Sequence, residues 1–146
     1  MRIFTRPTRR VLNCTQHWTS TEQLEEGVED LPLDLMAAIR AAITFDLLPT
    51  EEEIEERCAR VVGLLSPAYP SPYGRLAYDE DPWDPTVVTD NHWVLIGGAP
   101  FLMGPLTAAL KKAGYRVLFA FSKRVSEEDK TGRKMSIFRH IGFVES

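Results

Sequence analysis

Residues 92–122 read HWVLIGGAPFLMGPLTAALKKAGYRVLFAFS. A short apolar run over 92–96 ends in the pair Gly97-Gly98, and an amphipathic helical pattern over 100–113 ends at Gly114. Residues 115–121 are the most strongly apolar run of the chain and predict a second strand. A strand, a glycine turn, a helix and a strand in this order are typical of the parallel unit of an α/β sheet.

A second unit of the same kind opens the chain. Residues 10–15, RVLNCT, predict a strand that leads into the polar loop QHWTS. Ser20 and Gln23 then have the spacing of a capping box at the start of a short helix. Gly27 closes that helix, and residues 28–31 predict a brief further strand.

The remaining segments complete the expected architecture. Apolar residues recur at helical spacing over 33–47, and a helix over 50–65 begins with Thr50 as its N-cap and acids in its first turn. The segment 66–90 holds five prolines and four aromatic residues, which predicts a surface insertion without regular structure. Residues 135–144 alternate and predict an antiparallel partner for 115–121 across a polar loop, 122–134.

The length of 146 residues and the 44% hydrophobic content fit one globular domain over 1–146. The predicted fold class is therefore α/β, a three-layer, mostly parallel sheet with a C-terminal β-hairpin. No apolar run approaches the roughly 20 residues that span a bilayer, and no signal peptide is recognisable. We expect a soluble, cytoplasmic protein in which Cys14 and Cys58 are reduced, buried packing residues rather than disulfide partners or zinc ligands.

The net charge of −4 conceals a strong segregation along the chain. Residues 1–19 carry four Arg and no acid, residues 20–90 carry seventeen acids and four Arg, and residues 91–146 carry nine basic residues and four acids. If the two cationic ends meet in the fold, they would suit an anionic ligand. The alternative is that these charges are simply solvated.

Polar and glycine residues follow three of the predicted strands, where an open parallel sheet gathers its ligands. They are Asn13, Thr15, Gln16, His17 and Ser20; Gly97 and Gly98; and Ser122, Lys123 and Arg124. Amides, hydroxyls, a histidine, a glycine turn and two cations together indicate a site for a phosphodiester.

Each of these residues also has a structural interpretation. A loop histidine such as His17 is often only a surface or hydrogen-bonding residue. The Gly97-Gly98 pair is not a dinucleotide fingerprint and is compatible with a simple tight turn. Lys123 and Arg124 could be solvated hairpin residues. Arg139 and His140, adjacent in a strand, must point to opposite faces, and one of them is a candidate for contact with a ligand or partner.

Other chemistries lack support in the sequence. There is no GxSxG elbow, HExxH motif, Walker loop or EF-hand, so we expect no metal and no cofactor. Trp18, beside His17, could stack a base, although a role in packing is the common alternative.

The segments LNCTQHWTSTEQ, GVEDLP, IGGAPFLMGPL, FAFSKRVSEE and SIFRHIGFVE resemble a group of small proteins, without a settled activity, carried by bacteria, phages and plasmids. The opening, a strand with Asn-x-x-x-His-x-x-Ser/Thr-x-x-Gln, is also similar to that of small CRISPR-associated ring nucleases over roughly the first 25 residues. Those are CARF-like, Rossmann-like proteins that cleave cyclic oligoadenylate messengers without a metal. This resemblance implies a CARF-like fold and a ligand loop containing Asn13, His17, Ser20 and Gln23, whereas the insertion 66–90 departs from it.

Together these features favour a homodimer that binds, and cleaves without a metal, a cyclic oligonucleotide used in antiviral defence. In this hypothesis His17 assists the attack of a ribose 2′-hydroxyl, while Lys123 or Arg124 stabilises the charge on phosphorus. Duplex nucleic acid and membranes are not expected partners. Two alternatives stay open: an interaction protein from a mobile element that docks through its aromatic insertion, and a module that binds simple nucleotides.

Overall fold

The apolar runs of the sequence become the centre of one mixed sheet in a computed structural model of the chain, which describes residues 2–4, 11–70 and 93–146. The strands are β1 (Arg2–Phe4), β2 (Val11–Cys14), β3 (Val28–Asp30), β4 (Trp93–Ile96), β5 (Arg116–Glu128) and β6 (Lys134–Glu145). Their order across the sheet is β1-β6-β5-β4-β2-β3. Strands β3, β2, β4 and β5 run parallel to their neighbours, whereas β6 is antiparallel to both β5 and β1. The chain is thus an α/β protein with a mostly parallel sheet and a C-terminal antiparallel hairpin, as predicted.

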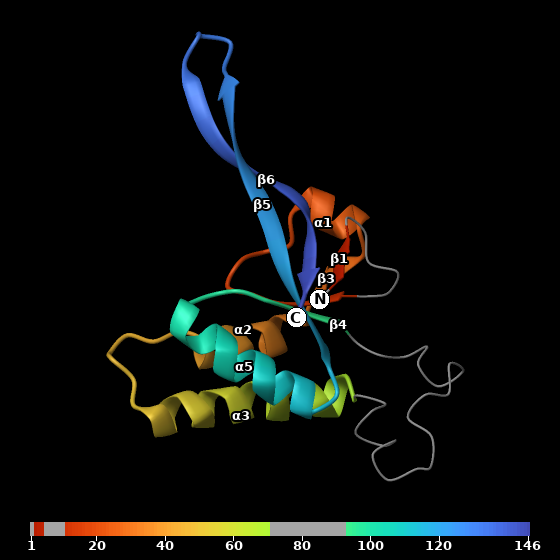
Figure 1. Ribbon diagram of the computed structural model, residues 1–146, viewed down its shortest axis with the longest axis vertical. Coiled ribbons are helices and arrows are strands. Elements are labelled where there is room, and N and C mark those ends of the chain that lie inside the picture. Colours follow the sequence, from red (N-terminus) through yellow and green to blue (C-terminus); the bar gives the residue numbers. More distant parts are fainter. Residues whose placement is uncertain (1, 5–10, 71–92) are drawn as a thin grey trace, which may run out of the picture.

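Helices cover the two faces of this sheet unequally. The helices are α1 (Thr21–Glu25), α2 (Leu33–Ala42), α3 (Glu51–Ala68) and α5 (Pro100–Lys112). In Figure 1, α2, α3 and α5 lie together on one side of the sheet, and the short α1 lies on the other. The larger core forms on the three-helix side around Leu12, Val94 and Val117, and a smaller cluster around Leu95 and Phe143 lies on the opposite face. Strands β2 and β4 are buried at every position, which is typical of parallel strands covered on both sides.

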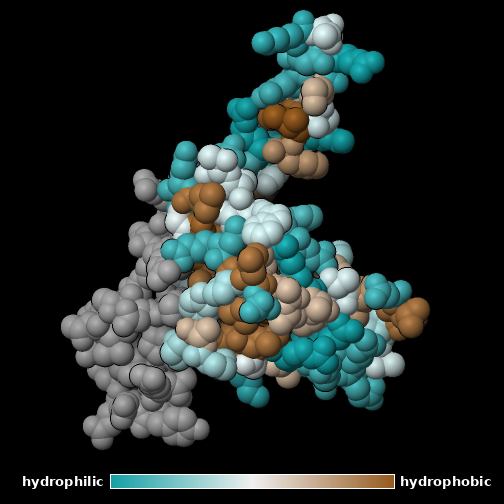
Figure 2. All heavy atoms as spheres, turned by 180° about the vertical axis from the view of Figure 1, so that it is seen from behind, coloured by the Kyte–Doolittle hydropathy of each residue, from teal (hydrophilic) through white to brown (hydrophobic). Residues whose placement is uncertain are grey.

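The C-terminal hairpin is much longer than the sequence predicted. Residues 122–128 and 134 were expected in a loop, but they continue β5 and β6, so that Ser122–Glu128 pair with Lys134–His140. The prediction was wrong because this part of β5 has no apolar alternation, and backbone bonds to β6 hold it instead. The outer hairpin projects beyond the body of the molecule (Figure 1). From behind, its surface mixes hydrophobic with hydrophilic side chains (Figure 2), and Phe138 is 73% exposed.

A β-bulge changes the direction of the side chains in β6. Phe121 pairs with Gly142, but the next residue, Ser122, pairs with His140, so Ile141 has no opposite residue. The extra residue places His140 on the same face as Phe143, with 4.7 Å between the two ring centroids.

Several element boundaries differ from those predicted. Strand β1 was not predicted; it pairs with the end of β6, so the two ends of the chain meet in the sheet. Helix α2 ends at Ala42 rather than at 47, and α3 continues to Ala68 rather than ending at 65. Residues 71–90 of the predicted insertion, and the arginines at 6, 9 and 10, lie outside the described residues.

Both cysteines are free and buried, which confirms their assignment as packing residues. Burial raises the pKa of the Cys14 thiol to about 12 and raises that of Cys58 as well. Among the described residues, no helix has the length and apolar character that a bilayer-spanning segment needs.

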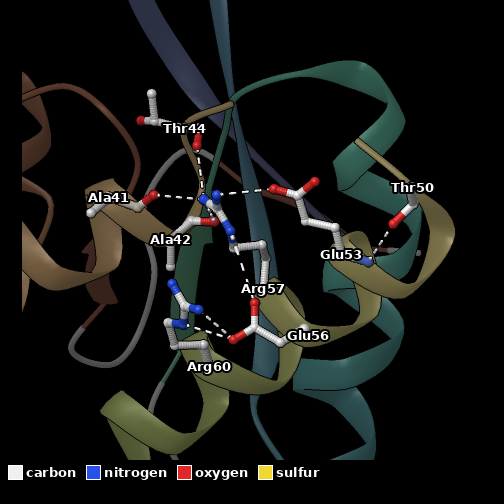
Figure 3. A network of polar contacts seen from close by, with 8 residues as sticks. All are labelled: Ala41, Ala42, Thr44, Thr50, Glu53, Glu56, Arg57 and Arg60. Atoms are coloured by element: carbon white, nitrogen blue, oxygen red, sulfur yellow. Dashed lines mark hydrogen bonds and ion pairs between the residues drawn. The ribbon is translucent and has the colours of Figure 1, made fainter. Parts of the chain in front are cut away.

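Arg57 ties α3 to the carboxyl end of α2 (Figure 3). Its Nη1 donates to the carbonyl oxygens of Ala41, Ala42 and Thr44, at 2.9, 3.2 and 2.9 Å. The last carbonyls of a helix lack partners within the helix, so this guanidinium supplies what α2 cannot. The same contact fixes the turn after α2, against which the loop following β2 packs.

We expect Arg57→Ala to lower the free energy of unfolding by about 2 kcal/mol, because three carbonyl oxygens lose a charged donor. The measurement is urea unfolding followed by circular dichroism. Arg60→Ala is the matched control, since Arg60 lies on the same helix and pairs only with the exposed Glu56. It should change the stability by no more than about 0.5 kcal/mol. Equal losses in the two variants would contradict a specific role for Arg57.

Candidate ligand site at the carboxyl edge of the parallel strands

The direction of the chain reverses between β2 and β4. These strands are parallel neighbours, but β2 continues through α1 to β3 on one side, and β4 continues through α5 to β5 on the other. The loops that follow them therefore diverge to opposite faces of the sheet, and open α/β sheets bind their ligands at this kind of switch point. The loop after β2 carries residues 15–20, and the turn after β4 carries Gly97 and Gly98.

Buried Asn13 organises the loop after β2. Its Nδ2 donates to the carbonyl oxygen of His17 at 2.7 Å and to the carboxylate of Asp30 at 2.9 Å. Its Oδ1 accepts from the backbone N–H and the hydroxyl of Thr15, at 3.0 and 2.7 Å. The amide is only 2% exposed, so it fixes the path of the loop from within rather than facing a ligand.

Asp30, at the end of β3, is the second anchor of this loop. Its Oδ1 accepts hydrogen bonds from the backbone N–H and hydroxyl of Thr19, at 3.1 and 2.7 Å, and from Asn13. Burial opposes ionisation, but the hydrogen bonds from Thr19 and Asn13 and the positive charge of Arg40 outweigh it. The pKa of Asp30 therefore lies below its ordinary value of 3.8.

This depressed pKa makes stability depend on acid. The ionised form is stabilised by folding, so its contribution is complete above pH 3.8 and is lost as the pH falls through the lower folded pKa. We expect Asp30→Asn to reduce stability at neutral pH and to flatten its acid dependence, measured by urea unfolding at a series of pH values. Asp46→Asn, at an exposed turn, controls for the loss of one negative charge. Parallel acid profiles for the wild type and Asp30→Asn would contradict this assignment.

The turn after β4 touches the loop after β2. A Cβ on Gly97 would lie 3.5 Å from Cγ2 of Thr15, which is ordinary van der Waals contact. Gly98 has a φ of +147°, which side chains rarely adopt, so its glycine is required by the backbone of the turn. The sequence-predicted residues Thr15, Gly97 and Gly98 thus meet at one place.

Two further predicted ligand residues are engaged within the protein. Gln16 donates from Nε2 to the hydroxyl of Thr44 at 3.1 Å and thereby attaches the loop to the turn after α2. Ser20 and Gln23 form the expected capping box of α1, each accepting from the backbone N–H of the other at 3.2 and 3.1 Å. Both side chains shape the loop.

His17 differs from these neighbours because its side chain is exposed. The backbone is nevertheless held, since its N–H donates to Thr15 Oγ1 at 3.2 Å and its carbonyl oxygen accepts from Asn13. An imidazole on a fixed, exposed backbone at a switch point can accept or donate a proton.

Arg40, on α2, lies next to this loop and was missed by the sequence analysis. Its guanidinium carbon is 4.9 Å from the ring centroid of Trp18, which is 60% exposed. A single arginine on a helix gives no signal in the sequence that would have identified it.

The predicted basic residues of the hairpin are placed elsewhere. Leu118 is the last residue of β5 paired with β4, and Lys123 follows it by five residues, so it lies about 16 Å further along the strand. Arg124 lies over the ring of Phe138, 5.8 Å from its centroid, and Ser122 is exposed. These residues extend past the edge on which His17 lies.

Arg139 and His140 point to opposite faces of β6, as predicted. The Arg139 side chain is 55% exposed and bonds to Glu127 at 2.6 Å. The His140 side chain is only 4% exposed, and its Nε2 lies 2.7 Å from the Glu26 carboxylate next to α1. His140 therefore joins α1 to the hairpin and is not available to a ligand at the edge.

Comparison with known proteins adds one finding. A sequence model of the uncharacterised protein MJ1673 family matches residues 81–144, which is less than half of the chain. The match includes the glycine turn, α5 and most of the hairpin, but not the loop after β2. No curated protein and no solved structure matches the chain. Within the described ranges, no three His, Cys, Asp or Glu side chains are grouped as metal ligands.

Proposed function

We propose that this chain binds a cyclic oligoadenylate at the carboxyl edge of β2 and β4 and cleaves it without a metal. The observation that carries the proposal is the exposed His17 on a loop that buried Asn13 holds at the switch point of the sheet. The sheet order and the similarity of the opening segment to ring nucleases support a Rossmann-like, CARF-like assignment. A cyclic oligonucleotide messenger is made inside cells, so the proposal implies a cytoplasmic protein.

The reaction needs no external nucleophile. The ribose 2′-oxygen forms a bond to the adjacent phosphorus, and the bond from phosphorus to the 5′-oxygen breaks. His17 takes the proton of the 2′-hydroxyl, and the 5′-oxygen leaves as a hydroxyl after gaining a proton. The products are a linear chain with a 2′,3′-cyclic phosphate and a 5′-hydroxyl. Positioning and proton transfer are the contributions required of the protein.

The test is incubation with cyclic tri-, tetra- and hexa-adenylate in the presence of a chelator, followed by chromatography of the products. We expect a linear product with a cyclic phosphate end from at least one ring. Tight binding without products would reduce the proposal to a binding protein. A thermal shift with simple nucleotides but not with cyclic rings would favour the mononucleotide module instead.

The basic residues of the hairpin give a separate prediction. Lys123 is exposed, and we assign it a phosphate of the ring other than the one that reacts. Lys123→Ala should weaken binding and reduce the slope of log affinity against log salt by about 0.7, as for one lost phosphate contact on a single strand. The measurement is a binding titration at several salt concentrations. An unchanged affinity and slope would remove the hairpin from the site.

We also propose a homodimer in which a second copy covers the outer hairpin. A two-stranded ribbon is marginally stable in water by itself, and this one exposes Phe138 and Met135. Light scattering of the purified protein should give twice the chain mass, and Phe138→Ser should shift it towards the monomer. A monomer at all concentrations would contradict this arrangement.

A further inference from the structure

Arg40 has an unusual environment for a charged side chain. Its Nε and Nη2 atoms are buried and have no hydrogen-bond partner among the described residues. Asp30 is near enough for its pKa to be lowered by the Arg40 charge, but no ion pair joins the two. The Oδ1 of Asp30 already accepts three hydrogen bonds from Thr19 and Asn13.

Arg57 shows what a structural arginine looks like in the same region. Its Nη1 reaches three carbonyl oxygens at the end of α2, and its Nη2 bonds to Glu53 at 3.2 Å. The fold thus supplies acceptors to Arg57 and none to the two buried nitrogens of Arg40. Buried guanidinium donors are rarely left unpaired, so an acceptor from outside the chain would complete this group.

The group covering Arg40 belongs to the loop that carries His17. Trp18 follows His17 directly and places its indole over the guanidinium, 4.9 Å from ring centroid to guanidinium carbon. The indole is 60% exposed, so little of the protein packs on its outer side. Gln16 attaches the same loop to Thr44, just after the helix that carries Arg40.

We propose that Arg40 is a phosphate-binding residue of the ligand site and that Trp18 is its cover. When an oligonucleotide binds, the indole leaves the guanidinium and stacks on a base, and the freed Nε and Nη2 donate to two phosphate oxygens. The guanidinium fork matches phosphate geometry in two parallel hydrogen bonds, and indole rings stack on any base. This inference rests on the proposed function and adds the cation that the His17 loop itself lacks.

The first experiment titrates cyclic tetra-adenylate into the wild type, Arg40→Gln and Arg40→Lys, and follows both affinity and tryptophan fluorescence. We expect Arg40→Gln to bind roughly 10- to 100-fold more weakly, as for the loss of hydrogen bonds to a charged group. Arg40→Lys should lie between the two, because it keeps the charge but not the fork. Arg60→Gln removes the same charge from exposed α3 and should bind like the wild type.

The fluorescence change reports the cover directly. It should disappear in Trp18→Phe, whereas the buried Trp93 is unaffected. The melting temperature of Arg40→Gln should not fall below that of the wild type, because no hydrogen bond of Arg40 is lost. An affinity equal to that of the wild type in Arg40→Gln would overturn the inference, as would a fluorescence change that persists in Trp18→Phe.

Titration with AMP separates this inference from the proposed function. AMP carries one base and one phosphate, so it needs the Trp18–Arg40 pair but not a cyclic ring. Arg40-dependent quenching by AMP without binding of any cyclic oligoadenylate would support the pair and overturn the proposed function. Binding of the rings with equal affinity by the wild type and Arg40→Gln would support the function and overturn the pair. Binding of neither probe would overturn both.

Discussion

His17→Ala is expected to reduce the rate of cyclic oligoadenylate cleavage by about 100-fold or more, the usual contribution of general acid–base help. Binding should change little, because the phosphate contacts proposed for Arg40 and Lys123 stay in place. The fold should also remain, since the side chain is exposed and the loop is held through its backbone. The free energy of unfolding should change by less than about 1 kcal/mol. The measurements are single-turnover cleavage and urea unfolding of the same preparation.

Thr21→Ala is the matched control for this variant. Thr21 is exposed at the first position of α1, close to His17 in the sequence, and has no proposed role. It should keep both cleavage and stability. Cleavage that is unchanged in His17→Ala would show that the histidine does not transfer the proton. Unfolding of His17→Ala would show that it is structural.

Asn13→Ala is expected to produce the largest loss of stability among these variants, about 3 kcal/mol, because several polar groups lose their partner in a buried place. The Asp30 carboxylate and the His17 carbonyl oxygen lose a donor, and the Thr15 N–H and hydroxyl lose an acceptor. Cleavage should fall as well, since the loop that carries His17 loses its anchor. Thermal and urea unfolding give the stability, and the cleavage assay gives the activity.

Asn13→Asp sharpens this test. The new carboxylate would lie where the amide now donates to Asp30 at 2.9 Å, so two negative charges would meet in a buried position. We expect a loss of stability at neutral pH that is partly recovered when the pH is lowered and one of the two carboxyls is protonated. The change in pH dependence is opposite in sign to that of Asp30→Asn. A stable Asn13→Ala with intact cleavage would contradict the central role given to this amide.

Local patterns in the sequence determined most of the inner fold. The short apolar runs around Val11 and Val94 predicted the parallel strands, because burial on both faces requires continuous apolar residues. The capping residues Ser20 and Thr50 correctly marked the starts of α1 and α3, because a cap is satisfied by a residue three positions away. The loop containing His17 was also located, since it lies between two such signals.

Only the tertiary structure decided which of these residues are free and which are engaged. Asn13 and Ser20 were grouped with His17 as ligand residues, but their side chains hold the loop, whereas that of His17 is exposed. The length of the hairpin and the burial of His140 depend on pairing between β5 and β6 and on a bulge that no local pattern marks. Arg40 and Arg57 are indistinguishable in sequence, yet one has acceptors and the other does not. The physical reason is that apolar periodicity and caps are properties of neighbouring residues, whereas hydrogen-bond partners distant in sequence exist only once the chain has folded.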